Sequence, residues 1–301
     1  MKVFLYTTFA LVAFAFNSIL CRLALRGDEA DAGGFTAVRL LSGAVALIVI
    51  SFLVPSLKSQ ESQVTSDGGR LGTLDLRLGI MRGSWLSALL LFAYAICFSF
   101  AYLGLTAGTG ALILFGSVQM TMIAATLFRG ERPRPLEWLG LAVAVGGLIY
   151  LVFPGLASPP LNSSLLMAAA GASWGLYTLR GKGSTDPLGQ TTGNFIRTLP
   201  FAALIALIFL PNLHLSTRGI TFAVLSGAVT SGIGYTVWYA ALKHHTATRA
   251  AVLQLSVPVI TATIGVLFLA EIADTRLAAA TTLILGGIGL TIVGRNAEAR
   301  A

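Results

Sequence analysis

Charged residues are scarce in this chain: they make up 11% of its 301 residues, whereas 55% are apolar. Soluble domains carry roughly 25% charged residues. The composition therefore excludes an ordinary soluble domain and predicts an all-α integral membrane protein that crosses the bilayer several times. The two cysteines, Cys21 and Cys97, both lie within apolar runs and lack the spacing of a metal site or a disulfide framework. No metal and no cofactor is expected.

Acidic residues and histidines are missing from the middle of every apolar run. Glu131, Glu137, Glu271 and Asp274 all lie at run ends, and the three histidines lie in loops. Proton relays through membranes use such side chains at mid-depth, and an intramembrane enzyme needs a nucleophile with a base. The sequence thus argues against an enzyme and predicts facilitated diffusion or exchange rather than proton-driven transport.

Basic residues outnumber acidic ones, 20 to 12, but they are spread over short loops and form no basic stripe, so nucleic-acid binding is not expected. Ten apolar runs are long enough to cross a bilayer. They cover residues 3–25, 33–54, 84–104, 106–128, 136–153, 163–180, 191–210, 217–241, 247–270 and 277–294. The polar segment 55–83 is predicted to be a flexible surface loop.

The loop charges predict the orientation of the chain. Ten crossings place both termini on one side, where 14 basic residues fall, against four on the other side. Because basic residues stay on the cytoplasmic side, both termini are expected in the cytoplasm, with the protein in the bacterial inner membrane.

The two halves of the chain echo each other. Arg22 and Arg39 recur as Arg180 and Arg197, each 158 residues later. This predicts two repeats, 1–155 and 156–301, with five spans each. Because five is odd, the second copy enters the membrane from the opposite side, as in many secondary transporters with a site at the repeat interface.

A short motif closes the fourth run of each half. It is "LFRGERP" at 127–133 and "LFLAEIA" at 267–273, and the next run carries a glycine pair, Gly146-Gly147 or Gly286-Gly287. These features resemble the EamA-type group of the drug/metabolite transporter superfamily, and the chain is most similar there to YddG-like amino-acid exporters. The resemblance implies export of small metabolites by alternating access. The family pattern has proline inside both fourth helices; Pro258 keeps it, and Gln119 replaces it in the first half.

Polar and aromatic side chains within the runs are candidates for a substrate cavity. Pro258 cannot donate a hydrogen bond to the carbonyl of Gln254, which leaves polar groups at mid-depth. An amide facing lipid is costly, so such residues face either a cavity or a neighbouring helix. The candidate substrate-binding residues are Asn17, Phe98, Gln119, Trp174, Tyr177, Tyr235, Trp238 and Gln254. Tyr102, Tyr239, Trp85 and Trp138, near run ends, fit an interfacial aromatic belt.

Arg39 and Arg197 each lie several residues inside a run. Either they snorkel to the nearby interface or they recognise a carboxylate, which a guanidinium binds bidentately. Together with Pro258 and the glycine pairs Gly146-Gly147 and Gly286-Gly287, they form the candidate structural and gating set. The glycine pairs are expected to permit close helix packing.

The sequence favours a transporter that exports amino acids, aromatic ones included, or related metabolites. Efflux of cationic drugs is the alternative, although it would call for a buried carboxylate. Sugar-phosphate exchange could use only Arg39 and Arg197, and a membrane helper subunit without transport activity is the remaining possibility. The expected partners are the small-molecule substrate and membrane lipid, with the protein as a monomer or homodimer.

Overall fold

The structure is a computed structural model that describes residues 2–58, 83–128, 135–153, 158–182, 184–242, 244–245, 253–272 and 274–296. In lipid a backbone must satisfy its own polar groups, so the apolar runs fold as helices. Within the described ranges the regular structure is helical, with one isolated β-bridge between Ala30 and Leu215. Most of the loop predicted at 55–83 lies outside these ranges, and its first residues belong to a helix.

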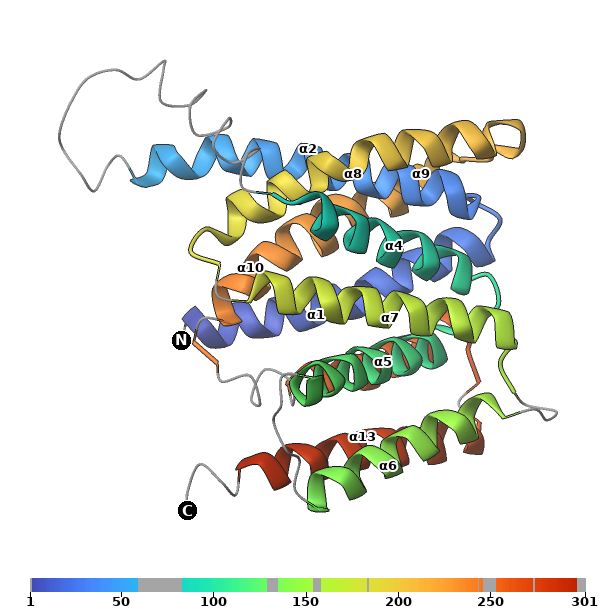
Figure 1. The fold of residues 1–301 in the computed structure, drawn as a ribbon. Helices are drawn as coiled ribbons and strands as arrows, with labels where there is room; N and C mark the ends of the chain where they lie inside the picture. Colours follow the sequence, from blue (N-terminus) through green and yellow to red (C-terminus); the bar gives the residue numbers. More distant parts are fainter. Residues whose placement is uncertain are drawn as a thin grey trace.

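Figure 1 shows the helices lying side by side, with the start of the first helix and the end of the last at the same end of the bundle. The long elements are α1 (Lys2–Arg26), α2 (Ala32–Lys58), α4 (Trp85–Ala101), α5 (Ala107–Phe128), α6 (Pro135–Val152), α7 (Leu161–Gly181), α8 (Pro187–Phe209) and α13 (Thr275–Asn296). The shorter ones are η1 (Leu210–Asn212), α9 (Thr217–Val224), η2 (Leu225–Ile233), α10 (Gly234–Leu242) and α12 (Ser256–Leu269).

Six helical segments of the described chain are long and apolar enough to cross a membrane, and three further apolar helices are shorter. Large apolar side chains point outward from several of them, including Phe4 (73% exposed) and Leu267 (70%). Water would disfavour such a surface, whereas lipid tails solvate it. The all-α membrane fold is therefore confirmed, while the count of ten crossings stays a prediction.

One predicted span, 217–241, is a helix of mixed geometry. α9 and α10 are joined without a break by the π-helix η2. η2 lies against α2, and a Cβ atom added to Gly227 would collide with the backbone oxygen of Arg39. Glycine at this position therefore lets the two backbones approach closely. Long π-segments are rare and often occur at functional sites.

Pro258 lies beside a break in the predicted run 247–270. Residues 253–254 are helical, Leu255 interrupts the helix with right-handed helical dihedral angles (φ −66°, ψ −17°), and α12 begins at Ser256. The break falls where Pro258, which has no N–H, cannot donate a hydrogen bond to the carbonyl of Gln254.

Only one glycine of each predicted pair packs closely against a neighbouring helix. α6 and α13 lie along each other at one edge of the bundle (Figure 1). A Cβ atom on Gly287 would lie 2.5 Å from the backbone nitrogen of Ala144, and one on Gly147 would lie 2.7 Å from the Cβ of Leu283. Gly146 and Gly286 have open space at the same position. Only the second glycine of each pair permits the close approach.

This asymmetry predicts opposite effects of the same substitution at neighbouring positions. Gly287→Ala forces a methyl group into backbone atoms of α6 and is expected to destabilise the protein by about 1–3 kcal/mol. Gly286→Ala meets nothing and should stabilise the helix by about 0.5–1 kcal/mol. Thermal unfolding of the purified protein in detergent measures both. Equal midpoints for the two variants would contradict the packing described.

Candidate substrate-binding site

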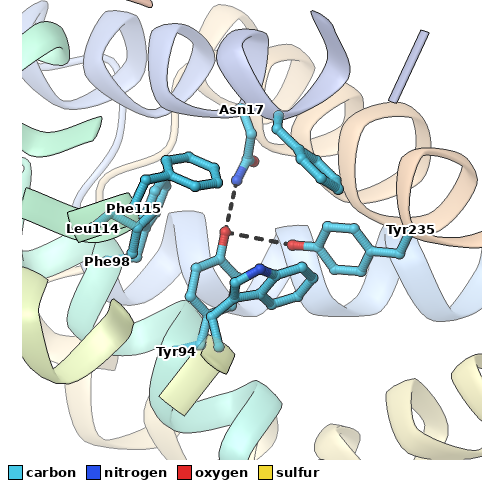
Figure 2. A pocket seen from close by; sticks show the side chains of 8 residues that line it. Asn17, Tyr94, Phe98, Leu114, Phe115 and Tyr235 are labelled. Carbon is cyan, nitrogen blue, oxygen red and sulfur yellow. Dashed lines mark hydrogen bonds between the residues drawn. The ribbon is translucent and has the colours of Figure 1, made fainter. Parts of the chain in front are cut away.

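A small cavity lies inside the bundle where helices from both ends of the sequence meet. Its empty volume is about 270 Å³. The lining residues come from α1, α4, α5, α7 and α10, and they are Phe14, Asn17, Tyr94, Phe98, Leu114, Phe115, Trp174 and Tyr235. Figure 2 shows these side chains around the central space. Most of this volume is narrow space between side chains, and the room left for a further molecule is about that of one water, so the side chains themselves nearly fill the site.

Aromatic rings form most of the cavity wall. The ring centroid of Trp174 lies 4.5 Å from that of Tyr235 and 5.0 Å from that of Tyr94. Phe14 meets Trp174 edge-on, with the centroids 6.1 Å apart. Such pairs stabilise one another beyond their buried area, and they offer apolar faces with polar tips. The wall therefore suits a small amphipathic molecule.

Asn17 forms hydrogen bonds with three polar side chains at or beside the cavity. Its Oδ1 accepts hydrogen bonds from Ser226 Oγ (2.7 Å) and Thr230 Oγ1 (3.1 Å). Its Nδ2 donates to the hydroxyl of Tyr94 (3.0 Å). The amide thus links α1 to η2 and α4, and Figure 2 shows its nitrogen directed at the Tyr94 oxygen. The sequence analysis identified Asn17 but missed Ser226 and Thr230, whose i, i+4 spacing puts them on one helical face.

Arg39 lies behind the tyrosines and is only 1% exposed. Its Nη2 donates to the hydroxyls of Tyr94 (3.0 Å) and Tyr235 (3.2 Å), and its Nε donates to Ser231 Oγ (3.3 Å). The guanidinium carbon also lies 5.0 Å from the ring centroid of Phe98. Snorkelling to the membrane surface is therefore wrong for Arg39, which is held inside the protein beside the cavity.

Arg197, 158 residues later, has a different environment. It is partly exposed, and its Nη1 donates to the backbone oxygen of Gly193 (3.0 Å). Its guanidinium lies 6.0 Å from the ring of Trp85, which is 60% exposed. Neither arginine is among the residues that line the cavity, but Arg39 bonds two of them, Tyr94 and Tyr235. The two arginines that match in sequence are therefore not equivalent in structure.

The structure brings four of the predicted substrate-binding residues to this cavity: Asn17, Phe98, Trp174 and Tyr235. Trp238 packs on Phe14 with their centroids 5.7 Å apart, one layer behind the wall. The remaining candidates, Gln119, Gln254 and Tyr177, are buried but do not line the cavity.

Tyr177 borders a second, smaller pocket. Its hydroxyl accepts a hydrogen bond from Asn194 Nδ2 (3.3 Å), and Tyr239 also lines this pocket. Tyr239 (5% exposed) and Tyr102 (fully buried) do not form an interfacial belt, contrary to the sequence expectation. Trp85 and Trp138 are exposed on the surface of the bundle, as residues of an interfacial belt must be.

Four lining residues were not chosen from the sequence: Phe14, Tyr94, Leu114 and Phe115. Tyr94 carried a usable signal, since it precedes Phe98 by one helical turn and so shares its face. Phe14, Leu114 and Phe115 carried none, because apolar side chains on a membrane helix face lipid, core or cavity alike.

A second polar cluster closes the end of the bundle opposite the start of α1. Glu271 pairs with Arg22 Nε (3.4 Å) and accepts the backbone N–H of Ala107 at the first residue of α5 (2.9 Å). Arg22 Nη1 also donates to the backbone oxygen of Tyr102 (3.0 Å). A carboxylate at a helix N-terminus is favourable, so the cluster joins α1, α5 and the end of α12.

A bundle of apolar helices around a small, partly polar cavity is compatible with a membrane carrier. The comparison with known proteins is more specific: the profile of the EamA-like transporter family matches residues 1–153 and 161–293. The chain belongs to this family, which confirms the resemblance to the drug/metabolite transporter superfamily.

The curated relatives extend over much or all of the chain. An uncharacterised protein of Pseudomonas aeruginosa is 46% identical over 99% of this chain and 97% of its own length. A "Probable amino-acid metabolite efflux pump" of Salmonella typhimurium is 27% identical over 67% of this chain and 72% of its own. A solved crystal structure matches with a TM-score of 0.63 at 20% identity, over 96% of this chain and 98% of that one, which shows a shared fold.

The hydrogen bonds of Asn17 predict a stability effect. Asn17→Leu would leave the buried Ser226 hydroxyl and other polar groups without their partner, and should destabilise the protein by about 1–3 kcal/mol. Ser117→Ala is the control, because the Ser117 hydroxyl is buried without a hydrogen-bond partner and its loss should cost nothing. Thermal unfolding in detergent compares them, and an unchanged midpoint for Asn17→Leu would contradict its linking role.

Proposed function

We propose that this protein exports small amino-acid-like metabolites across the bacterial inner membrane by alternating access, as a monomer or homodimer. Residues 1–155 and 156–301 act as two inverted repeats, with both termini in the cytoplasm. The observation that carries the proposal is the position of the cavity. Its wall combines α1, α4 and α5 from the first half with α7 and α10 from the second half. Carriers built from inverted repeats bind their substrate at such an interface.

The packing of the helices supports the two-repeat proposal. α1 packs on η2 and α10, while α4 packs on α7; α2 packs on α8, α5 on α12 and α6 on α13. Exchanging each helix for its counterpart five spans away maps this set of contacts onto itself. Such a pattern is what two repeats related by a two-fold axis require, and inverted repeats of this kind let one group of helices rock against another around a fixed site.

The chemistry of the cavity favours an amino-acid-like substrate over a cationic drug. No carboxylate lines it in the described part of the chain, and the guanidinium of Arg39 lies against its wall. A cationic ligand would be repelled there, whereas aromatic rings and hydroxyls accommodate a molecule with an apolar side chain and a polar head. The Salmonella typhimurium relative, named as an amino-acid metabolite efflux pump, agrees with this substrate class.

The lack of a carboxylate among the described lining residues also bears on how transport is driven. A proton-driven antiporter needs a group that substrate and proton share, and Glu271, the acid considered from sequence, is engaged with Arg22 and α5 outside the cavity lining. Glu131 lies outside the described residues. Facilitated diffusion or exchange therefore accounts for transport without a proton site, and export proceeds down the gradient of an overproduced metabolite.

Alternating access gives the Arg22–Glu271 cluster a role as a gate. It joins three helices at the end of the bundle that the charge distribution places outside the cell. The cavity can open to that side only when these contacts separate. The cluster thus stabilises the closed form with respect to the outside, and weakening it shifts the population towards the outward-open form.

Counterflow tests the transport function. Proteoliposomes loaded with excess unlabelled L-phenylalanine are expected to accumulate external labelled L-phenylalanine transiently, with competition by amino acids but not by amines or phosphate esters. An imposed proton gradient, with substrate equal on both sides, should cause no net accumulation. Uptake no greater than in empty liposomes would favour a helper subunit, and accumulation abolished by a protonophore would refute uncoupled transport.

A cysteine in the cavity tests the gate. Leu114→Cys is labelled from outside by a membrane-impermeant thiol reagent, with Cys21 and Cys97 replaced by serine. Adding Glu271→Gln should raise the labelling rate on the order of fivefold, the population change that about 1 kcal/mol produces. Asp274→Asn is the matched control, because Asp274 only caps α13 through Leu277 N (2.6 Å). Equal rates in both variants would contradict the gate.

A further inference from the structure

The charge of Arg39 is uncompensated inside the protein. Its side chain is 1% exposed, and no carboxylate of the described residues forms an ion pair with it. A buried charge without a counter-ion is costly, and in membrane spans such residues mark the path of a substrate or ion. Hydroxyls and the faces of Tyr94 (5.1 Å) and Phe98 (5.0 Å) compensate it only in part.

Hydrogen-bond donors outnumber acceptors around this guanidinium. The Tyr94 oxygen receives the amide of Asn17 (3.0 Å), Nη2 of Arg39 (3.0 Å) and the hydroxyl of Tyr235 (3.4 Å), as Figure 2 shows in part. A phenol oxygen offers two lone pairs and carries a proton of its own. One acceptor thus serves three donors.

One donor of the guanidinium is left without a hydrogen bond. Nη1 of Arg39 is buried and bonds to none of the described residues, although Nε and Nη2 of the same guanidinium are engaged. A buried unsatisfied donor on a charged group is strongly unfavourable. Nη1 and Nη2 carry parallel N–H bonds that can donate side by side to one ligand. In this structure hydroxyl oxygens accept from Nη2, whereas the donors of Nη1 are unused.

From these three observations we propose that Arg39 binds the carboxylate of the transported molecule, which is a small monocarboxylate with an aromatic or bulky apolar group. A carboxylate supplies the missing negative charge and about four acceptor sites, and it fits the fork bidentately. It displaces the weak hydroxyl bonds to Nη2 and reaches Nη1. The apolar part then lies among Phe14, Phe98 and Trp174, whose rings must separate because the cavity is nearly full.

This assignment rests on the proposed function for its transport role, but binding can be measured by itself. Purified protein is titrated with 3-phenylpropionate and with 3-phenylpropionamide, which has the same shape without the charge, and binding is read from the change in tryptophan fluorescence, to which Trp174 in the cavity wall contributes. The acid is expected to bind at least about tenfold more tightly than the amide. Equal affinities, or no binding of the acid, would overturn the proposal.

Substitutions locate the effect on Arg39. Arg39→Gln should weaken binding of 3-phenylpropionate by about tenfold or more and change that of the amide much less, and Arg39→Lys should fall between. Arg197→Gln, at the matching position of the second half, should leave the affinity unchanged. Acid binding that survives Arg39→Gln in a folded protein would overturn the proposal. If Arg39→Gln does not fold, the difference in affinity between 3-phenylpropionate and 3-phenylpropionamide for the unaltered protein tests the proposal.

The two proposals can fail separately. Counterflow of labelled L-phenylalanine tests transport, whereas the acid and amide pair tests recognition. Transport of 3-phenylpropionamide as fast as 3-phenylpropionate would refute the role of Arg39 and leave the carrier intact. Charge-dependent binding without counterflow would refute the carrier and leave the binding site intact.

Discussion

A guanidinium held away from water is the constraint around which the centre of this protein is organised. Arg39 projects from α2, and the groups that keep it there come from other helices: Tyr94 from α4, Ser231 from η2 and Tyr235 from α10. Asn17 of α1 joins the same network through Tyr94. Three helices, which are α2, α4 and the continuous segment of η2 and α10, must therefore be in place before the charge is even partly compensated, and Tyr94 and Tyr235 of this network also line the cavity.

Close backbone approach makes this arrangement possible. Gly227 lets the π-helix η2 lie against the backbone of Arg39, which brings Ser226, Thr230 and Ser231 toward the polar centre. Among membrane helices, packing of small residues and hydrogen bonds replace the hydrophobic driving force that acts in water. At the edge of the bundle, Gly147 and Gly287 serve the same physical need between α6 and α13.

The two halves have kept a common pattern but use it differently. Arg39 is buried at the cavity, whereas its counterpart Arg197 lies near the exposed Trp85. Pro258 lies beside a break in its helix, whereas Gln119 lies within the unbroken α5. The proposed substrate has a charged end and an apolar end, so one guanidinium beside the cavity matches it better than a symmetric pair would.

Much of the fold followed from the sequence because bilayer physics leaves few choices. Long apolar runs can satisfy their backbone only as helices, so the all-α membrane class and the approximate positions of α1, α2 and α4 to α8 were predictable. The exceptions are the π-geometry of η2 and the late start of α12 at Ser256, which depend on what packs beside them. The family assignment also came from sequence, through the repeated Glu-containing motif.

The site was only partly predictable, for a different physical reason. Asn17, Phe98, Trp174 and Tyr235 were identifiable as polar or aromatic residues in apolar runs, but composition cannot tell whether such a residue faces a cavity, a helix or lipid. Orientation around each helix axis decides that, and it is fixed only by packing. The sequence by itself determined a helical membrane carrier with polar groups at mid-depth. Only the tertiary structure selected Arg39 over Arg197 and kept Gln119 and Gln254 out of the cavity wall, because burial and hydrogen-bond partners are properties of several helices together.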